Sequence, residues 1–436
     1  MRHHRLITRL ALVAVLALVA GACRQAEGPG DQETVEDERG VIEIAADEPI
    51  KIATIQTISG DTASLGQDQV RAIEIAIADK GQLLGHDIEL QVEDGLCSAE
   101  GGTAAAQKIA ADPQVVAVIG TSCSGAAVPA APILDDAGIP LISGSNTSPF
   151  LTQAPFGTEG EDHAPNYFRT AHNDLIQGAA AARFAFEECG VTKAASIHDG
   201  DPYTSGLAGA FDDAFKELGG EQVLATAVGV DDTDMRPVLT EVAAAGAEIV
   251  FFPIFQPAAD FIVKQAKEID GLQNTVLMSA DGTLSDTFVE IGETKQAPAC
   301  PGLDGAVPGV YHSGPATPTG GTYAEFVTKY EDEYGEKPIQ AFHAHSYDAT
   351  NVLFAAIESV AAEGEDGSLQ IGKQALIDAI AGTSGFEGLT GTIECDEFGD
   401  CADPKIDIIQ NTEDTKDLTA VKENILATFT AEDVGL

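Results

Sequence analysis

The sequence lacks tryptophan and is poor in positive charge. It contains 23 Lys and Arg against 70 Asp and Glu, so its formal net charge is −47. Such a charge repels nucleic acid and anionic lipid surfaces and keeps a chain soluble, which excludes nucleic acid as a partner. Adaptation to a saline exterior, where carboxylates are screened, explains the acidity without any charge-specific function.

Recognisable metal-binding and redox patterns are also missing. No C-x-x-C pair occurs, so neither a zinc ribbon nor a thioredoxin-type site is supported. His343 and His345 are two residues apart on an expected helix and therefore face different directions. We accordingly predict no metal centre and no cofactor.

The apolar segment near the start is too short to span a membrane. Leu10 to Val19 is about half of the roughly 20 residues that a spanning helix needs. Arginines precede it and Ala20-Gly21-Ala22 follow it. This pattern predicts a signal peptide over residues 1–22 and an exported protein.

The next residue, Cys23, resembles the lipidated cysteine of bacterial lipoproteins. This resemblance implies a lipid anchor at the outer face of the cytoplasmic membrane or in the periplasm. The alternative is cleavage without lipidation, which leaves Cys23 as a free thiol. Residues 23–49 are acidic and poor in aromatics, so we expect an unfolded tether.

Six further cysteines suit an oxidising compartment. Cys395 and Cys401 flank the turn-like stretch "DEFGD" and are close enough in sequence to close a short loop by a disulfide. Residue spacing does not choose among the other pairings, so Cys189 and Cys300 stay unassigned.

From Ile50 onward, strand-like and helix-like segments alternate. The expected strands are apolar runs such as 50–57, 88–93, 115–120, 194–199, 248–255 and 275–282. Strands separated by helices predict right-handed crossovers and parallel sheets covered on both faces. The pattern occurs twice, so we predict an α/β fold of two Rossmann-like lobes.

Four polar, glycine-containing corners follow strands. They are "GTSCSGAA", "ISGSNTSPFLT", "HDGDPYTSG" and "SADGT". In open parallel sheets, ligands bind outside the carboxyl ends of the strands, in front of helix N-termini. These corners therefore predict one ligand-binding cleft between the lobes.

The first corner nearly matches the nucleophile elbow of serine hydrolases. Its last position is Ser124 where that motif needs glycine. No histidine belongs to a recognisable partner motif, so we assign no catalytic residue and expect no enzyme. Hydroxyls beside the backbone N–H groups of a helix N-terminus instead favour binding of a carboxylate.

Together, five stretches resemble the branched-chain amino-acid (leucine/isoleucine/valine) binding proteins of ABC transporters, which have the type I periplasmic-binding fold. The resemblance covers residue 50 to about 411. The stretches are "IQTISGDTASLGQDQVRAIEIAIADKG", "GTSCSGAAVPAAPILDDAGIPLISGSNTSPFLT", "YFRTAHNDLIQG", "HDGDPYTSGLA" and "GTIECDEFGD".

The resemblance implies a role for individual residues. Ser124, Ser145 and Thr147 would hold the ligand's carboxylate, with Ser145 acting mainly through its backbone. Asp281 would bind the ammonium group, although leucine binders carry glutamate there. Tyr203 and Phe255 would form an aromatic wall, and Leu65 stands where many members have an aromatic residue.

The resemblance also implies a disulfide between Cys97 and Cys123 and a three-segment hinge. It divides the chain into a first lobe of residues 50–170 and 310–404 and a second of 171–309 and 405–436. The Cys395–Cys401 clip has no counterpart in the familiar leucine binders and is expected near the hinge.

The predicted function is capture of an amino acid, of branched-chain type, by a monomer that delivers it to an ABC transporter permease. The membrane is contacted only through the lipid anchor. Three alternatives stay open: the same fold binding an amide, urea or small aromatic acid, an exported sensor without a transporter, and a hydrolase that uses Ser124.

Overall fold

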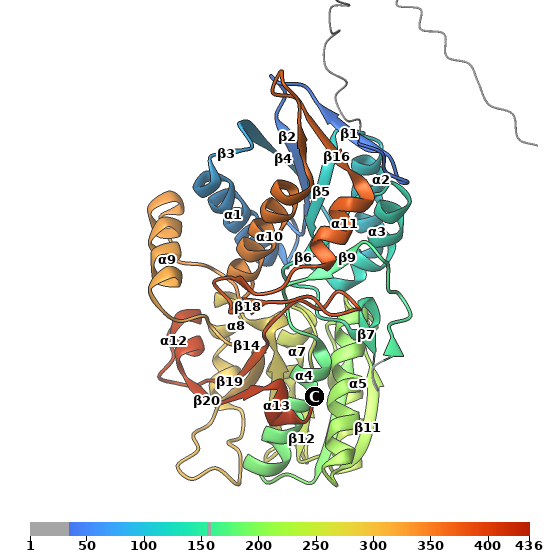
Figure 1. The fold of residues 1–436 in the computed structure, drawn as a ribbon. Helices are drawn as coiled ribbons and strands as arrows, with labels where there is room; N and C mark the ends of the chain where they lie inside the picture. The colour runs from blue at the N-terminus through green and yellow to red at the C-terminus, as the bar shows by residue number, and fades with distance from the viewer. Residues whose placement is uncertain (1–34, 155–157) are drawn as a thin grey trace, which may run out of the picture. The chain divides into compact units, whose positions relative to one another are not determined.

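The computed structural model describes residues 35–154 and 158–436 (Figure 1). The predicted signal peptide and Cys23 lie outside these residues. The expectation of an unfolded tether up to residue 49 is wrong at its end, because β1 (Val41–Ile44) pairs antiparallel with β16 (Leu369–Gly372). Ile42 and Ile44 alternate with exposed neighbours and are buried, so this short strand contributes to the core.

The first lobe is built on a six-stranded sheet of order β3-β4-β2-β5-β6-β9. All neighbours are parallel except the pair β3 and β4. In this order the strands are β3 (Gln82–Leu83), β4 (His86–Asp94), β2 (Ile50–Gln56), β5 (Val115–Gly120), β6 (Leu141–Ser143) and β9 (Tyr167–Arg169).

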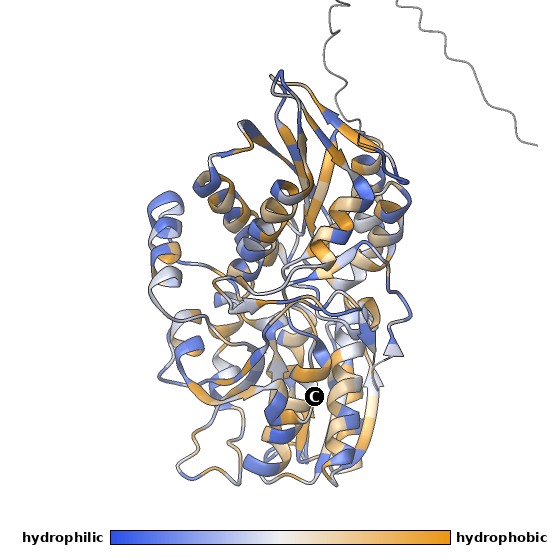
Figure 2. Cartoon of the chain, in the orientation of Figure 1, coloured by the Kyte–Doolittle hydropathy of each residue, from blue (hydrophilic) through white to orange (hydrophobic). Residues whose placement is uncertain are grey.

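Helices cover both faces of this sheet because its central strands are apolar on both faces. Ile52 of β2 packs with one group of helices, whereas Ala53 packs with the other. Figure 2 shows hydrophobic residues along these strands. The first group is α1 (Ala63–Lys80), α10 (His343–Val360) and α11 (Lys373–Ala381), and the second is α2 (Ala99–Ala110) and α3 (Ser124–Asp136).

The second lobe is built on a seven-stranded sheet of order β11-β10-β12-β13-β14-β19-β20. Its first five strands are parallel and the last two antiparallel. In this order they are β11 (Glu221–Ala227), β10 (Lys193–His198), β12 (Ile249–Phe251), β13 (Val276–Ala280), β14 (Val310–Pro315), β19 (Lys405–Asn411) and β20 (Ile425–Thr430).

Side chains alternate between the two faces of β12, and helices cover this sheet on both faces as well. Phe251 packs with α4 (Asp174–Arg183) and α5 (Pro202–Glu217), whereas Val250 packs with α6 (Arg236–Ala245) and α7 (Ala258–Ala266). The predicted α/β fold is confirmed. The remaining helices are α8 (Asp286–Val289), α9 (Gly321–Tyr334), α12 (Leu418–Glu423) and α13 (Ala431–Val434).

Residues 310–315 differ from the expected division. That division placed them in the first lobe, but β14 pairs with β13 and β19 in the seven-stranded sheet. The sheet that β14 joins depends on its pairing with strands about 30 and 90 residues away, which the local pattern does not encode.

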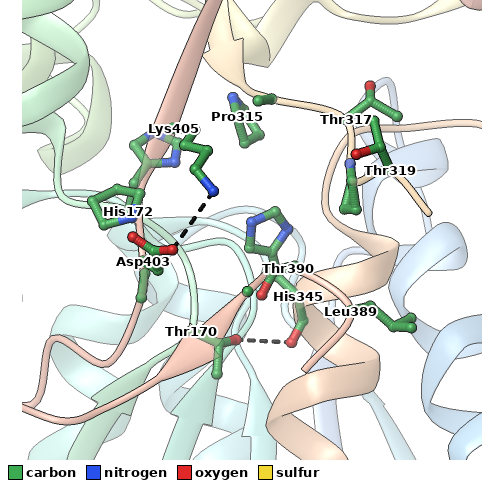
Figure 3. A pocket seen from close by; sticks show the side chains of 15 residues that line it. Thr170, His172, Pro315, Thr317, Thr319, His345, Leu389, Thr390, Asp403 and Lys405 are labelled. Atoms are coloured by element: carbon green, nitrogen blue, oxygen red, sulfur yellow. Dashed lines mark hydrogen bonds and ion pairs between the residues drawn. The ribbon is translucent and has the colours of Figure 1, made fainter. Parts of the chain in front are cut away.

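Three connections between the sheets meet around one cavity of about 190 Å³. Thr170 and His172 follow β9, residues 315–319 begin at the last residue of β14, and residues 402–405 end at the first residue of β19. His345 of α10 lines the same space (Figure 3). We call this the hinge cavity.

The described residues form three disulfides. Cys97–Cys123 and Cys395–Cys401 are present as predicted, and Cys189 pairs with Cys300. Within residues 35–154 and 158–436, no helix combines the length and apolar character needed to cross a bilayer.

Candidate functional site

The corner "GTSCSGAA" connects β5 to α3. Gly120 has φ of 141°, and a Cβ there would lie 2.4 Å from the carbonyl oxygen of Ile55, so only glycine fits. Ser122 donates a hydrogen bond to Gln56 Oε1 at 2.5 Å and accepts one from the Thr57 amide at 3.0 Å. The hydroxyl of Ser122 therefore braces the corner.

The three residues expected to hold a carboxylate are all buried. Ser124 Oγ accepts a hydrogen bond from the Ser148 amide at 3.3 Å, which leaves its proton to donate. Ser145 Oγ lies 2.8 Å from the Ser122 carbonyl and 3.0 Å from Gln69 Oε1, so its proton is used within the lobe. Ser145 thus has its backbone, rather than its hydroxyl, to offer a ligand.

Arg169 holds the loop that carries Ser145 and Thr147. Its guanidinium donates to the carbonyls of Asn146 and Ser148, at 3.2 and 2.8 Å, and forms an ion pair with Asp400. The side chain of Arg169 is fully buried. It therefore fixes the loop without being available to a ligand.

Asp281 lies directly after β13 and is 7% exposed. Its Oδ1 accepts hydrogen bonds from Gln177 Nε2 at 2.6 Å and from the Tyr203 hydroxyl at 3.3 Å. Burial raises the pKa of Asp281 to about 6, because these neutral donors offset only part of the desolvation. A cation at this carboxylate would supply the missing charge.

A second carboxylate, Asp174, lies at the start of α4. It is completely buried, and among the described residues its oxygens form no hydrogen bond of regular geometry. Burial and nearby Asp281 raise its pKa well above the usual value, and the Thr147 hydroxyl offsets only part of this. Two buried acids thus share one region, which favours a cationic ligand group.

Gln177 connects Asp281 to the hinge cavity. Its Nε2 donates to Asp281 and to the Ser313 carbonyl, so its Oε1 faces Nε2 of His172. His172 must therefore carry its proton on Nε2, and burial keeps it neutral by lowering its pKa to about 4. Its Nδ1 is buried and has no hydrogen-bond partner within the part of the chain that the structure describes, and His172 lines the hinge cavity.

Leu65, Phe255 and Asp281 line one small cavity together with residues of both lobes. Tyr203 stacks obliquely on Phe255, with ring centroids 5.1 Å apart, and contacts Asp281 through its hydroxyl. A Cβ on Gly282 would lie 3.1 Å from the Phe255 ring, so the backbone approaches these rings closely.

The lobes also touch at the first and third corners. Asp201, the N-cap of α5, is so close to the N-terminal turn of α3 that a Cβ on Gly125 would lie 2.1 Å from its Oδ2. Burial raises the pKa of Asp201 to about 7, and the Gly125 amide lowers it in part. The four predicted corners therefore belong to one interlobe region.

Sequence reasoning assigned no role to Asp174, Gln177 or His172. All three lie in "YFRTAHNDLIQG", a stretch that carried the family resemblance. The pattern that identified the other corners is present here too, because polar residues follow β9 and lie at the N-terminus of α4. A fifth strand-end corner could have been identified on that basis.

The family model for periplasmic binding proteins matches residues 49–399. An amino acid binding protein of Pseudomonas aeruginosa is 32% identical over 231 residues, which are 52% of this chain and 59% of that protein. A Leu/Ile/Val-binding protein homolog of Brucella suis is 29% identical over 346 residues, 79% of this chain and 85% of the relative.

Solved structures share the fold at low identity. A leucine-binding protein of Thermotoga maritima superposes with a TM-score of 0.73 at 23% identity, over 88% of this chain and 99% of that one. A solute-binding protein of Rhodopseudomonas palustris in complex with p-hydroxybenzoic acid gives 0.71 at 20% identity, over 88% and 98%.

Proposed function

Because this chain belongs to the periplasmic binding protein family of transport systems, we propose that it captures an amino acid between its lobes. In this proposal the chain is monomeric, is exported and lipidated at Cys23, and delivers its ligand to an ABC transporter permease. The names of its relatives, which include Leu/Ile/Val-binding proteins, support an amino acid as the ligand class.

The observation that carries the proposal is the pair of buried acids. Among the described residues, Asp281 accepts hydrogen bonds from the neutral side chains of Gln177 and Tyr203, and Asp174 accepts none of regular geometry. A ligand ammonium group would compensate both, since a buried carboxylate is stabilised by a nearby cation. A benzoate-type ligand has no such group and would bring a further negative charge beside them.

The carboxylate of the ligand would lie at the opposite wall. The free proton of Ser124, the backbone near Ser145 and Thr147, and the N-terminus of α3 are donors of the kind that bind carboxylates. Neither Ser122 nor Ser124 hydrogen-bonds to a histidine among the described residues, so a serine nucleophile has no base there.

Calorimetry with modified ligands tests the proposal. We expect L-amino acids to bind, whereas their amides, which lack the carboxylate, and their deaminated acids, which lack the ammonium, bind at least about tenfold more weakly. Equal binding of the deaminated acid, or tight binding of benzoate alone, would refute it.

The variant Asp281→Asn tests the ammonium site directly. It keeps the side-chain shape but removes the charge, so the binding free energy should become less favourable by about 2–5 kcal/mol. Asp231→Asn changes an exposed acid on the same lobe and should leave affinity unchanged. Full affinity in the Asp281 variant would contradict its role.

A further inference from the structure

The cavity beside Asp281 is lined mainly by polar side chains. We call it the side-chain cavity, because it borders Asp281, the residue proposed to bind the ligand's ammonium group. Its volume is about 20 Å³, room for about one water molecule, so a ligand side chain would enter it only with the lobes further apart. Leu65 and Phe255 are its large apolar residues. The polar side chains that line it are Asp61, Thr62, Ser64, Gln256, Asp281, Ser285 and Gln340.

We infer that the ligand carries a neutral polar side chain, a carboxamide or a hydroxyl, rather than the branched hydrocarbon expected from the sequence. This inference rests on the proposed function and specifies its ligand. It is carried by the hydrogen-bonding groups of the side-chain cavity.

Gln340 is fixed in place and buried. It is 6% exposed, its amide donates to Asp68 Oδ2 at 3.1 Å, and its carbonyl accepts from Lys422 Nζ at 2.5 Å. Its side-chain Nε2 donates to Ser64 Oγ at 2.9 Å. Among the described residues its Oε1 has no hydrogen-bond partner, so it is an oriented acceptor at the cavity wall.

Ser64 provides the complementary donor. Its Oγ accepts the hydrogen bond from Gln340, so its own proton remains to donate. Acceptor and donor thus lie side by side. A carboxamide matches such a pair with its N–H and C=O groups, and a hydroxyl matches it with one atom.

The opposite wall is polar as well. Ser285 Oγ donates to Gln256 Oε1 at 2.5 Å, and Gln256 Nε2 donates to Asp260 Oδ1 at 2.9 Å. An isobutyl or sec-butyl group would remove water from these groups and from Gln340 Oε1 without replacing its hydrogen bonds. Leaving a buried acceptor unpaired is costly, so the hydrocarbon binds more weakly.

The negative charges around the side-chain cavity disfavour a ligand with an acidic side chain. Asp61 lines the side-chain cavity, and Asp260 lies behind Gln256. The lining residues include no Lys or Arg. A carboxylate in the ligand side chain would face these acids without a cation to neutralise it.

L-Asparagine and L-leucine provide the decisive comparison, because their side chains have the same branching and nearly the same size. Calorimetry on the mature wild-type protein should give at least about tenfold tighter binding of asparagine, glutamine, serine or threonine than of leucine, isoleucine and valine. Tighter binding of leucine would overturn this inference and leave the proposed function intact. Failure of every amino acid to bind would overturn both.

Two variants test the residues involved. Gln340→Met keeps the length of the side chain and removes its oxygen, and Ser64→Ala removes the donor near the start of α1. Each should lower affinity for the polar ligand about tenfold and raise the leucine-to-asparagine affinity ratio. Gln107→Met, on the exposed surface of α2, is the matched control. An unchanged ratio in both site variants would refute the assigned roles.

Discussion

Gln177 and Asp281 are joined by a hydrogen bond of 2.6 Å from the amide to the carboxylate. The carbonyl oxygen of the same side chain accepts a hydrogen bond from His172 Nε2, and the other ring nitrogen of His172 is buried with no partner among the described residues. One side chain therefore orients the acid of the ligand site and connects it to the hinge cavity.

Removing this donor should change the pH dependence of binding. In the wild type, affinity should fall as the pH drops below about 6, because Asp281 becomes protonated and loses its attraction for an ammonium group. Gln177→Met should weaken binding at neutral pH and move this midpoint upward, since the lost hydrogen bond favoured the charged carboxylate.

Calorimetry between about pH 5 and pH 8 measures both effects. Gln222→Met is the control, because that amide bonds to Ser196 and Leu224 within the same lobe, away from Asp281. A midpoint that does not move in Gln177→Met would show that the hydrogen bond has no influence on Asp281.

Asp212 should lower the stability of the protein at high pH. Burial raises its pKa to about 7, and its Oδ1 has no hydrogen-bond partner in residues 35–154 and 158–436. The folded state then binds a proton that the unfolded state has released, so this contribution to stability is lost as the pH rises from about 4 to about 7.

Asp212→Asn removes this ionisation. It should stabilise the protein by roughly 1–3 kcal/mol at about pH 8 and have little effect near pH 4. Urea unfolding measures the difference. Its exposed neighbour provides the comparison, since Asp213→Asn should change stability by less than about 0.5 kcal/mol. A destabilised Asp212→Asn protein at pH 8 would contradict the assignment.

Removing either of two disulfides should lower stability, but removing only one of them should also weaken ligand binding. Cys97–Cys123 closes a separation of 26 residues and Cys189–Cys300 one of 111, so loop entropy predicts losses of about 3.5 and about 4.8 kcal/mol on replacement by alanine. Only Cys97–Cys123 braces the corner that carries Ser124. Its loss should therefore weaken ligand binding, whereas loss of Cys189–Cys300 should not.

Denaturant unfolding and calorimetry at a temperature where both variants are folded provide the two measurements. Equal affinities in the two variants would show that the Cys97–Cys123 bridge does not support the binding corner.

Arg169 should contribute strongly to the stability of the first lobe. Arg169→Met leaves Asp400 without its ion pair and two buried carbonyls without a donor, which predicts a loss of about 3–5 kcal/mol. Arg236→Met removes half-exposed ion pairs and should cost less than about 1 kcal/mol. Urea unfolding compares them, and similar losses would contradict the structural role of Arg169.

Local residue patterns were enough to predict strand β5 and the polar corners that follow the strands, although β1 was expected to be part of an unfolded tether. Strand β5 was predicted with its observed ends because a continuous apolar run can be buried only inside a covered sheet. The corners followed from the rule for strand ends in parallel sheets, and Cys395–Cys401 from a separation of six residues. These are local properties, set by neighbouring residues in the chain.

Which distant residues meet depends on how the layers of the fold pack together. Gln177 is 104 residues from Asp281, and Gln340 is 276 residues from Ser64. The sheet of β14 and the Cys189–Cys300 pair have the same origin. Such contacts arise when whole layers pack, and the burial that raises the pKa of Asp281 and of Asp174 exists only in that packed state.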